Sequence, residues 1–228
     1  MLSAPDRRIV CYVTNGRDFL PAERGDLALE NIHKALRAGA DWIQIREKDV
    51  SAKPLLKLTR ASVEMARLMS PAGRVFVNER LDVALAANAA GVHLGGNAIP
   101  RAEVVNWCRS ENAPADFLIG VSCHSVLEVR AAETAGVDYA FFGPVFDTPS
   151  KRVFGAPQGL AKLAQVCSAV HIPVIAIGGI QPSNAGDCFR AGAKGIAAIR
   201  LFQDPMQRPG LDDFISRLHS IRWGGAAG

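Results

Sequence analysis

Three polar side chains alternate with apolar ones in a short segment that could bind an anion. The segment reads WIQIREK, and Gln44, Arg46 and Lys48 occupy every second position in it. Side chains of an extended chain alternate between its two faces, so these three share one face. Taking an amide and two cations out of water there costs free energy unless an anion binds to them. Two cations match a bound phosphate. Internal ion pairs with Glu47 or Glu79 are the alternative, and we favour phosphate binding.

A second polar pair follows the apolar segment Arg74–Val77. Asn78 has the parity of Phe76, so both side chains are expected to face inward, where Asn78 could donate to a phosphate oxygen. Glu79 could bind a divalent cation through its carboxylate oxygens. A surface helix cap or a salt bridge is the alternative for Glu79.

Ser122 and His124 follow the apolar segment Phe117–Val121 and also share parity. His124 could transfer a proton near neutral pH. A nucleophilic serine–histidine pair would need a third, orienting group, which the spacing does not reveal. A hydrogen-bonded structural histidine is the alternative for His124 and is the expectation for His93.

The polar segment at residues 147–158 is expected to be a long loop, and long loops in compact barrels are commonly functional. It contains Thr148, Ser150 and Lys151 within four positions. Two hydroxyls and an ammonium group could surround the oxygens of an anion. A flexible loop without function is the alternative.

A pair of glycines, Gly178 and Gly179, follows the apolar segment Val174–Ile177. Paired glycines allow backbone N–H groups to approach a phosphate closely. A helix expected to begin near Pro182 would add positive potential at the same place. The segment is therefore a second candidate phosphate site.

Short apolar segments alternate with longer amphipathic ones along the chain, and this alternation predicts the fold. The expected strands are Ile9–Val13, Trp42–Ile45, Arg74–Val77, Gly91–Leu94, Phe117–Val121, Tyr139–Phe142, Val174–Ile177 and Gly195–Ile199. The expected helices are Asp26–Ala38, Ala52–Met69, Leu81–Ala89, Arg101–Arg109, Val126–Ala135, Leu160–Ala169, Pro182–Ala191 and Leu211–Ile221. Such units form parallel sheets with right-handed crossovers, and eight favour a closed (β/α)₈ TIM barrel over an open sheet. One domain is expected over residues 1–228, with a disordered tail at about 224–228.

Functional groups of such barrels lie at the C-terminal ends of the strands, where the polar positions above would converge. Tyr12 and Thr14, on the first strand, are expected to be packing residues. The pattern Ala-Gly-Ala/Val-Asp recurs before two strands, at Ala38–Asp41 and Ala135–Asp138.

The bulk composition is that of an ordinary globular protein and excludes several functional classes. Hydrophobic residues make up 49% of the 228 residues, and the net charge is +4. No basic block or aromatic-basic stripe indicates nucleic-acid binding. The sequence offers no apolar run of membrane-spanning length and no secretory signal. Five scattered cysteines suit a reducing compartment, so a cytoplasmic location is expected.

Several of these segments resemble motifs of the thiamine phosphate synthase/TenI family. They occur in family order between about Tyr12 and Ile199, which is most of the chain. The motifs are QxREK from Gln44, VN from Val77, GVHLG from Gly91, GVSxH from Gly120, GPxxxTxSK from Gly143 and IGGI from Ile177.

The resemblance implies a transferase of thiamine biosynthesis that joins hydroxymethylpyrimidine diphosphate to thiazole phosphate, releases pyrophosphate and uses Mg²⁺. Gln44 would hold the pyrimidine. The groups implied for the diphosphate are Arg46, Lys48, Asn78 and Lys151, with Ser122 nearby. The groups implied for the thiazole phosphate are Thr148, Ser150, Gly179 and the backbone of Ile199.

The sequence departs from the family pattern at three positions. Ala98 stands where a second carboxylate ligand of Mg²⁺ is expected, and Glu79 replaces an aspartate. Arg200 stands where a phosphate-binding serine is usual, and it could clamp the phosphate or occupy part of the site. Fewer carboxylates should weaken Mg²⁺ binding.

These departures leave alternatives to the synthase. A TenI-like thiazole tautomerase would need no metal and could use His124 as its acid and base. A non-catalytic regulator that binds thiamine phosphates is the third possibility. The expected partners are phosphorylated pyrimidine and thiazole compounds, and the sequence leaves homo-oligomerisation open.

Overall fold

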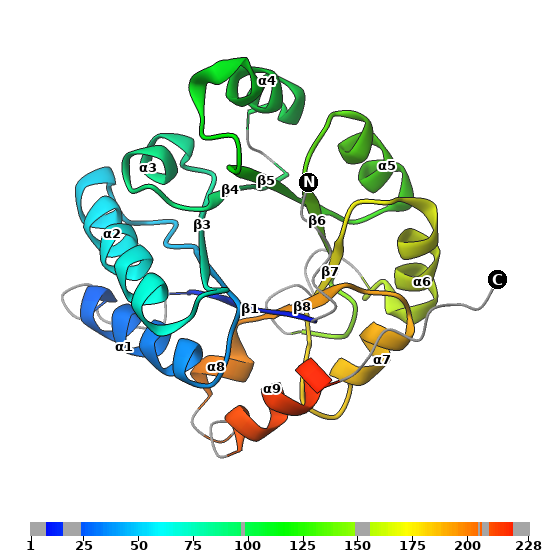
Figure 1. Cartoon of the computed structure of the whole chain (residues 1–228). Helices are drawn as coiled ribbons and strands as arrows, with labels where there is room; N and C mark the ends of the chain where they lie inside the picture. The colour runs from blue at the N-terminus through cyan, green and yellow to red at the C-terminus, as the bar shows by residue number, and fades with distance from the viewer. Residues whose placement is uncertain are drawn as a thin grey trace.

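Eight parallel strands close into a barrel, β1 pairing with β8, with helices around the outside (Figure 1). The computed structural model describes residues 8–15, 24–96, 99–148, 156–204, 206 and 210–220. The strands are β1 Ile9–Val13, β2 Trp42–Ile45, β3 Arg74–Asn78, β4 Gly91–Leu94, β5 Leu118–Cys123, β6 Tyr139–Phe142, β7 Val174–Ile177 and β8 Gly195–Ala198. The (β/α)₈ TIM barrel expected from the alternation of segments is confirmed, and every strand end lies within two residues of its expected position.

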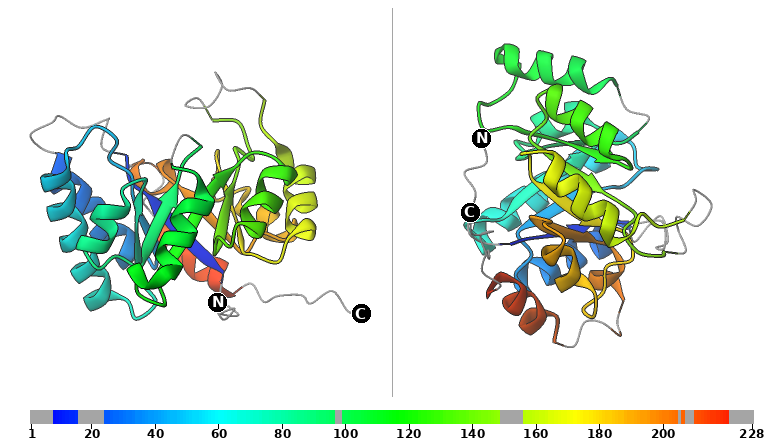
Figure 2. Two further views of the ribbon diagram at one scale, coloured as in Figure 1. Left: turned by 90° about the horizontal axis from the view of Figure 1, so that it is seen from above. Right: turned by 90° about the vertical axis from the view of Figure 1, so that its right-hand side faces the viewer.

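The helices pack along the outside of the strands in two further views (Figure 2). They are α1 Arg24–Arg37, α2 Ala52–Met69, α3 Leu81–Ala86, α4 Arg101–Trp107, α5 Val126–Thr134, α6 Gly159–Ala169, α7 Ala185–Arg190, α8 Arg200–Gln203 and α9 Leu211–Ser220. The largest differences from expectation are three: α3 ends at Ala86 rather than Ala89, α7 begins at Ala185 rather than Pro182, and α8 was not expected. The proposed tail at 224–228 lies outside the described residues. Among the helices that the structure describes, none has the length and hydropathy to cross a membrane.

The inside of the barrel is filled by aromatic rings together with aliphatic side chains such as Ile9, Val13 and Ile175. Trp42, Phe76 and Tyr139 form a mutually packed group with ring centroids 4.7–5.4 Å apart. Gly120 makes room for this group, because a Cβ atom at Gly120 would lie 2.0 Å from Cζ of Tyr139. The opposite faces of the strands, including Ile43 on β2, pack against the helices. This two-sided burial fixes which side chains point to the barrel axis.

The recurrent aspartates before β2 and β6 each bind the backbone of the preceding strand. Asp41 Oδ2 accepts from the N–H of Val10 at 2.9 Å and pairs with His219 Nε2 on α9 at 2.9 Å. Asp138 Oδ2 accepts from the N–H of Ile119 at 2.7 Å. The repeated motif therefore ties neighbouring strands together at their N-terminal ends.

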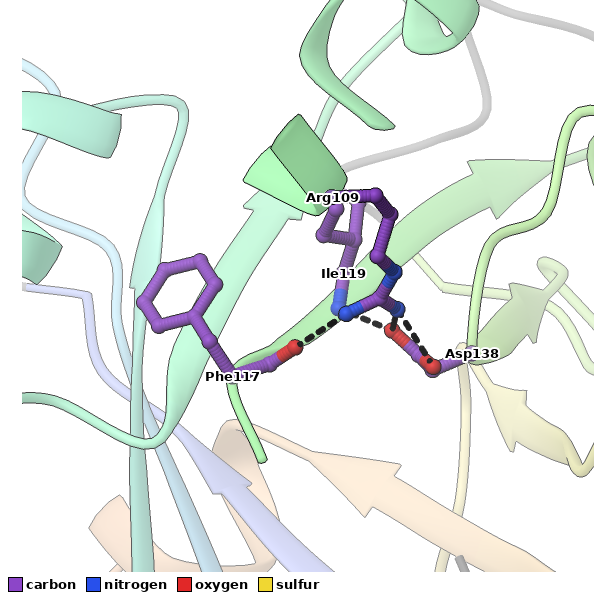
Figure 3. Close-up of polar contacts among 4 residues, drawn as sticks. All are labelled: Arg109, Phe117, Ile119 and Asp138. Carbon is purple, nitrogen blue, oxygen red and sulfur yellow. Dashed lines mark hydrogen bonds and ion pairs between the residues drawn. The ribbon is translucent and has the colours of Figure 1, made fainter. Parts of the chain in front are cut away.

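Arg109 completes the network around Asp138 (Figure 3). Its guanidinium group donates to both oxygens of Asp138, at 2.7 and 2.8 Å, and to the carbonyl of Phe117 at 3.1 Å. Arg109 lies in a π-helical turn, Cys108–Asn112, that follows α4. One side chain thus joins this turn to the starts of β5 and β6.

Replacing Asp138 by alanine should lower the free energy of unfolding by about 2 kcal/mol, since it removes charge-assisted bonds and leaves the N–H of Ile119 unpaired. Urea unfolding followed by circular dichroism measures the change. Glu30→Ala is the control, because the Glu30–Lys34 pair is exposed on α1 and should affect stability little. Equal effects of the two substitutions would contradict this account of the network.

Candidate active site

Gln44 and Asn78 meet at the barrel mouth, which is the end of the barrel formed by the C-terminal ends of the strands. Gln44 is buried near the end of β2, and its Nε2 donates to Asn78 Oδ1, at the end of β3, at 3.0 Å. Because Oδ1 of Asn78 accepts this bond, its NH₂ group is left to donate elsewhere. The inward orientation expected for Asn78 places this donor at the mouth.

Arg46 and Lys48 follow β2, which ends at Ile45. The N–H of Arg46 donates to Oγ1 of Thr14 at 2.9 Å, and Thr14 Oγ1 donates to Oε1 of Glu47 at 2.5 Å. Thr14 therefore positions the backbone of Arg46 and is more than a packing residue. The one sign of this role in the sequence is a hydroxyl residue at the end of an apolar segment. Lys48 is exposed, and its ammonium group makes no hydrogen bond or ion pair with any described residue.

Glu79 adopts a backbone conformation that is rare for side chains other than glycine. Its φ is +62°, and its N–H donates to the carbonyl of His93 at 2.8 Å. Its carboxylate lies over Gly95, where a Cβ atom would be 2.2 Å from Glu79 Oε1. The carboxylate is exposed, and the N-cap position of α3 is Arg80 rather than Glu79. Strained residues of this kind concentrate at functional sites.

A complete protein cage for a metal ion is absent from the part of the chain that the structure describes, where no three His, Cys, Asp or Glu side chains gather as ligands. Ala98, at the expected second ligand position, lies outside the described residues. Mg²⁺ is commonly held by one or two carboxylates plus substrate phosphates. The single carboxylate of Glu79 therefore fits a metal that is bound mainly through a diphosphate.

His93 is a buried, hydrogen-bonded histidine, as expected from the sequence. It is 1% exposed, and its two ring nitrogens contact Tyr139 Oη at 3.3 Å and Ser122 Oγ at 2.9 Å. Burial, helped by the positive charge of Arg46, lowers the pKa of His93 to about 3. The imidazole is therefore neutral at physiological pH, and the effect of Arg46 shows that its cation lies near the barrel interior.

The low pKa of His93 predicts a loss of stability in acid. An unfolded chain takes up a proton on this residue below about pH 6.5, whereas the folded protein does so only near a pKa of about 3. His93 should therefore lower the free energy of unfolding by up to about 1.4 kcal/mol for each pH unit of acidification within that window. Urea unfolding at several pH values should give a shallower pH slope for His93→Gln than for the wild-type protein. Parallel slopes for the two proteins would contradict the assignment.

His124 is exposed and is held in one orientation. Its Nδ1–H donates to the carbonyl of Gly143, and its backbone N–H donates to Glu128 Oε2 at 2.7 Å. Ser125 caps α5 by accepting from the N–H of Glu128 at 3.2 Å. With Nδ1 donating, Nε2 of a neutral His124 is an acceptor and could take a proton. A positioned acid or base and a structural histidine both fit this arrangement.

The loops after β6 and β7 run side by side. The N–H groups of Val145 and Phe146 donate to the carbonyls of Ile177 and Gly178, at 2.9 and 3.0 Å. Gly178 and Gly179 have φ of +98° and +66°, and a Cβ atom at Gly179 would lie 2.6 Å from the carbonyl oxygen of Asp147. Close approach of the two loops therefore requires these glycines, independently of any phosphate.

The remaining candidate residues belong to these two loops or to the end of β8. Thr148 is half-buried beyond Asp147, whereas Ser150 and Lys151 lie outside the described residues. Ile199 is half-buried directly after β8. Arg200 begins α8, is exposed, and its guanidinium group makes no hydrogen bond or ion pair with any described residue.

Asn184 was not identified from the sequence as part of the site. Its Nδ2 donates to the carbonyl of Gly179 at 3.0 Å, and its Oδ1 accepts from the N–H of Gln181 at 2.9 Å. It is also the N-cap residue of α7. The sequence did hold a signal for this role, because Asn184 follows a glycine pair and a proline. Asparagine favours turns and the first positions of helices.

A cavity of about 560 Å³ lies at the other end of the barrel. Its walls include Arg74, Ala90 and Phe117, which lie at or just before the starts of β3, β4 and β5. Barrel enzymes place their chemistry at the C-terminal ends of the strands, where Gln44, Asn78 and the other polar groups gather. We therefore assign the candidate active site to the barrel mouth and not to this cavity.

Comparison with known proteins agrees with the sequence motifs and the fold. The family model described as thiamine monophosphate synthase matches residues 10–202. A thiamine-phosphate synthase of Roseiflexus castenholzii is 40% identical over 195 residues, covering 86% of this chain and 81% of that protein. A thiamine-phosphate synthase of Methanocella arvoryzae is 44% identical over 177 residues, covering 77% of this chain and 80% of that protein.

A solved structure supports the same conclusion. Thiamine phosphate pyrophosphorylase from Pyrococcus furiosus superposes with a TM-score of 0.78 at 28% identity, covering 93% of this chain and 98% of that chain. The family model spans β1 to α8, and so includes every strand of the barrel. The chain therefore belongs to the thiamine monophosphate synthase family.

Proposed function

We propose that this protein is a thiamine-phosphate synthase, a transferase that joins hydroxymethylpyrimidine diphosphate to thiazole phosphate and releases pyrophosphate. The observation that carries the proposal is the family match over residues 10–202 of a chain whose Gln44, Arg46 and Asn78 lie at the barrel mouth. The substrates are small phosphorylated molecules, and phosphate binding is the central task of the site.

The reaction requires stabilisation of a departing diphosphate. The carbon–oxygen bond to the diphosphate breaks, and the thiazole nitrogen then forms a bond to the resulting pyrimidine methylene cation. Arg46, Lys48 and Lys151, together with the amide of Asn78, hold the diphosphate and offset the charge that develops on it. Gln44, fixed by its bond to Asn78, orients the pyrimidine. These groups stabilise the developing charge most if they are in place before the bond breaks. A preorganised site then needs little reorganisation at the moment of reaction.

The thiazole phosphate binds between the loops after β6, β7 and β8. Thr148 and Ser150 supply hydroxyls, Gly178 and Gly179 supply backbone N–H groups, and Ile199 supplies its backbone. Arg200, with a guanidinium group free of partners among the described residues, clamps this phosphate in place of the family serine.

A direct assay tests the proposal. Purified protein is mixed with both substrates and Mg²⁺, and thiamine phosphate is detected after conversion to fluorescent thiochrome. Product formation at enzyme-catalysed rates is the expected result. Binding of thiamine phosphate without turnover, at high protein concentration, would favour a regulator instead.

Mg²⁺ would supply additional positive charge to the diphosphate, with Glu79 as its carboxylate ligand. Because Ala98 offers no carboxylate, half-saturation should require a high Mg²⁺ concentration. Ala98→Asp should lower that concentration by about tenfold and raise the rate at limiting Mg²⁺. A Mg²⁺ titration of the rate measures both, with Ala98→Asn as a control that adds bulk without charge. An unchanged titration curve would remove Ala98 from the account of the metal site.

A thiazole tautomerase is the second candidate, favoured by the fixed ring of His124 and by an alanine rather than a carboxylate at position 98. His124 would then move the proton through Nε2. Isomerisation of the thiazole carboxylate phosphate without metal tests this activity. Isomerisation that survives in His124→Ala would exclude the residue as the acid or base.

A further inference from the structure

The hydroxyl of Tyr139 lies wholly inside the barrel, between rings and beneath the mouth. Tyr139 is 0% exposed, and its ring packs against Trp42, Phe76 and Phe141. Burial raises the pKa of Tyr139 well above its usual value, so the phenol keeps its proton. A buried hydroxyl proton without an acceptor is energetically costly, and this proton must therefore be donated to a neighbour.

Among the described residues, the partner of this hydroxyl is Nδ1 of His93, at 3.3 Å. The imidazole of His93 is itself buried, and in the described part of the chain its ring contacts two hydroxyls and no carboxylate that would hold a second ring proton. A neutral imidazole has one N–H donor and one bare acceptor nitrogen. Because Nδ1 accepts from Tyr139, the ring proton must reside on Nε2.

The Nε2–H group of His93 then faces Oγ of Ser122 at 2.9 Å, and Ser122 accepts this bond. The hydroxyl proton of Ser122 consequently cannot point back to His93. Ser122 is half-buried at the end of β5, and no other partner for its hydroxyl is found in the described part of the chain. Its proton is thus available to a ligand at the mouth.

We propose that Tyr139 and His93 form a hydrogen-bond relay that sets Ser122 as a donor toward an anionic oxygen of the substrate diphosphate. Tyr139 and His93 are positioning residues, since they act through Ser122. With the opposite histidine tautomer, Ser122 would donate inward and present only lone pairs to an anion, which would repel it. The identity of the ligand rests on the proposed synthase function, whereas the relay itself does not.

The tautomer of His93 is the first test. In protein labelled with ¹⁵N-histidine, the imidazole signals absent from His93→Gln belong to His93. We expect a protonated Nε2 and a bare Nδ1 that does not titrate between about pH 5 and pH 8. A protonated Nδ1 in the wild-type protein would overturn the proposal.

A double-mutant cycle is the second test. Tyr139→Phe should lower kcat/KM about tenfold, and pyrophosphate affinity by a similar factor, in the wild-type background. It should cause little further loss in the Ser122→Ala background, where no hydroxyl remains to be oriented. Equal losses in both backgrounds would indicate a merely structural role and overturn the relay.

Tyr12→Phe is the matched control. It removes the other tyrosine hydroxyl of the chain, which is also buried and accepts from Gln203 Nε2 at 3.0 Å, but on the outer face of β1. We expect it to leave kcat/KM within about twofold of wild type. If the wild-type protein forms no thiamine phosphate, the synthase proposal fails. Pyrophosphate binding and the His93 spectrum would then still decide the relay.

Discussion

Arg46→Ala should lower kcat/KM for thiamine phosphate formation by about 10²–10³-fold. The N–H of Arg46 is fixed by Thr14, and its cation is close enough to His93 to lower the pKa of that residue. A cation preorganised at a partly desolvated site stabilises a departing diphosphate far more than a freely mobile surface charge does. Arg46→Lys should recover only part of the loss, because lysine lacks the two-pronged geometry.

Kinetics with both substrates and Mg²⁺ measure this effect, and pyrophosphate inhibition provides an independent reading. The inhibition constant for pyrophosphate should rise in parallel with the loss of kcat/KM if Arg46 contacts the diphosphate. Arg67→Ala is the control, because Arg67 forms an exposed pair with Glu64 on α2. A change below about threefold for Arg46→Ala would remove the residue from the diphosphate site.

Gly179→Ala is expected to damage both stability and thiazole phosphate binding. The residue has φ of +66°, and its Cβ atom would lie 2.6 Å from the carbonyl oxygen of Asp147 and 2.7 Å from Cβ of Phe146. The loop after β6 would have to move away, and Thr148 would move with it. We expect a loss of about 2–4 kcal/mol in the free energy of unfolding, from backbone strain and overpacking.

The KM for thiazole phosphate should rise at least tenfold in the same variant, which corresponds to a loss of about 1.4 kcal/mol in binding free energy. The KM for the pyrimidine substrate should change less. Gly186→Ala is the control, since Gly186 lies within α7, and the atom nearest to its added Cβ would be the flexible end of Arg190 at 3.5 Å. That substitution should be neutral or slightly stabilising. A stable Gly179→Ala variant with unchanged KM values would show that the two loops separate without consequence.

Much of the barrel was predictable, because its signals are local. Each strand is a short apolar run between turn residues, and two-sided burial makes such runs continuous rather than alternating. Parity along β2 and β3 also placed Gln44 and Asn78 on the inner face, and the two side chains are hydrogen-bonded. The start of α7 was misplaced because Pro182 and Asn184 are both plausible first-turn residues, and only the bonds of Asn184 distinguish them.

The sequence by itself determined the family, the eight strands and the polar positions at their C-terminal ends, since each depends on residue types and spacing within one segment. The tertiary structure alone decided what those positions contact. Thr14 accepts a hydrogen bond from the backbone of Arg46. His93 is hydrogen-bonded to both Tyr139 and Ser122. The absence of a side chain at Gly179 leaves room for the carbonyl oxygen of Asp147. These contacts connect residues from different strands, and their distances follow from the closure and register of the barrel, which no single segment encodes.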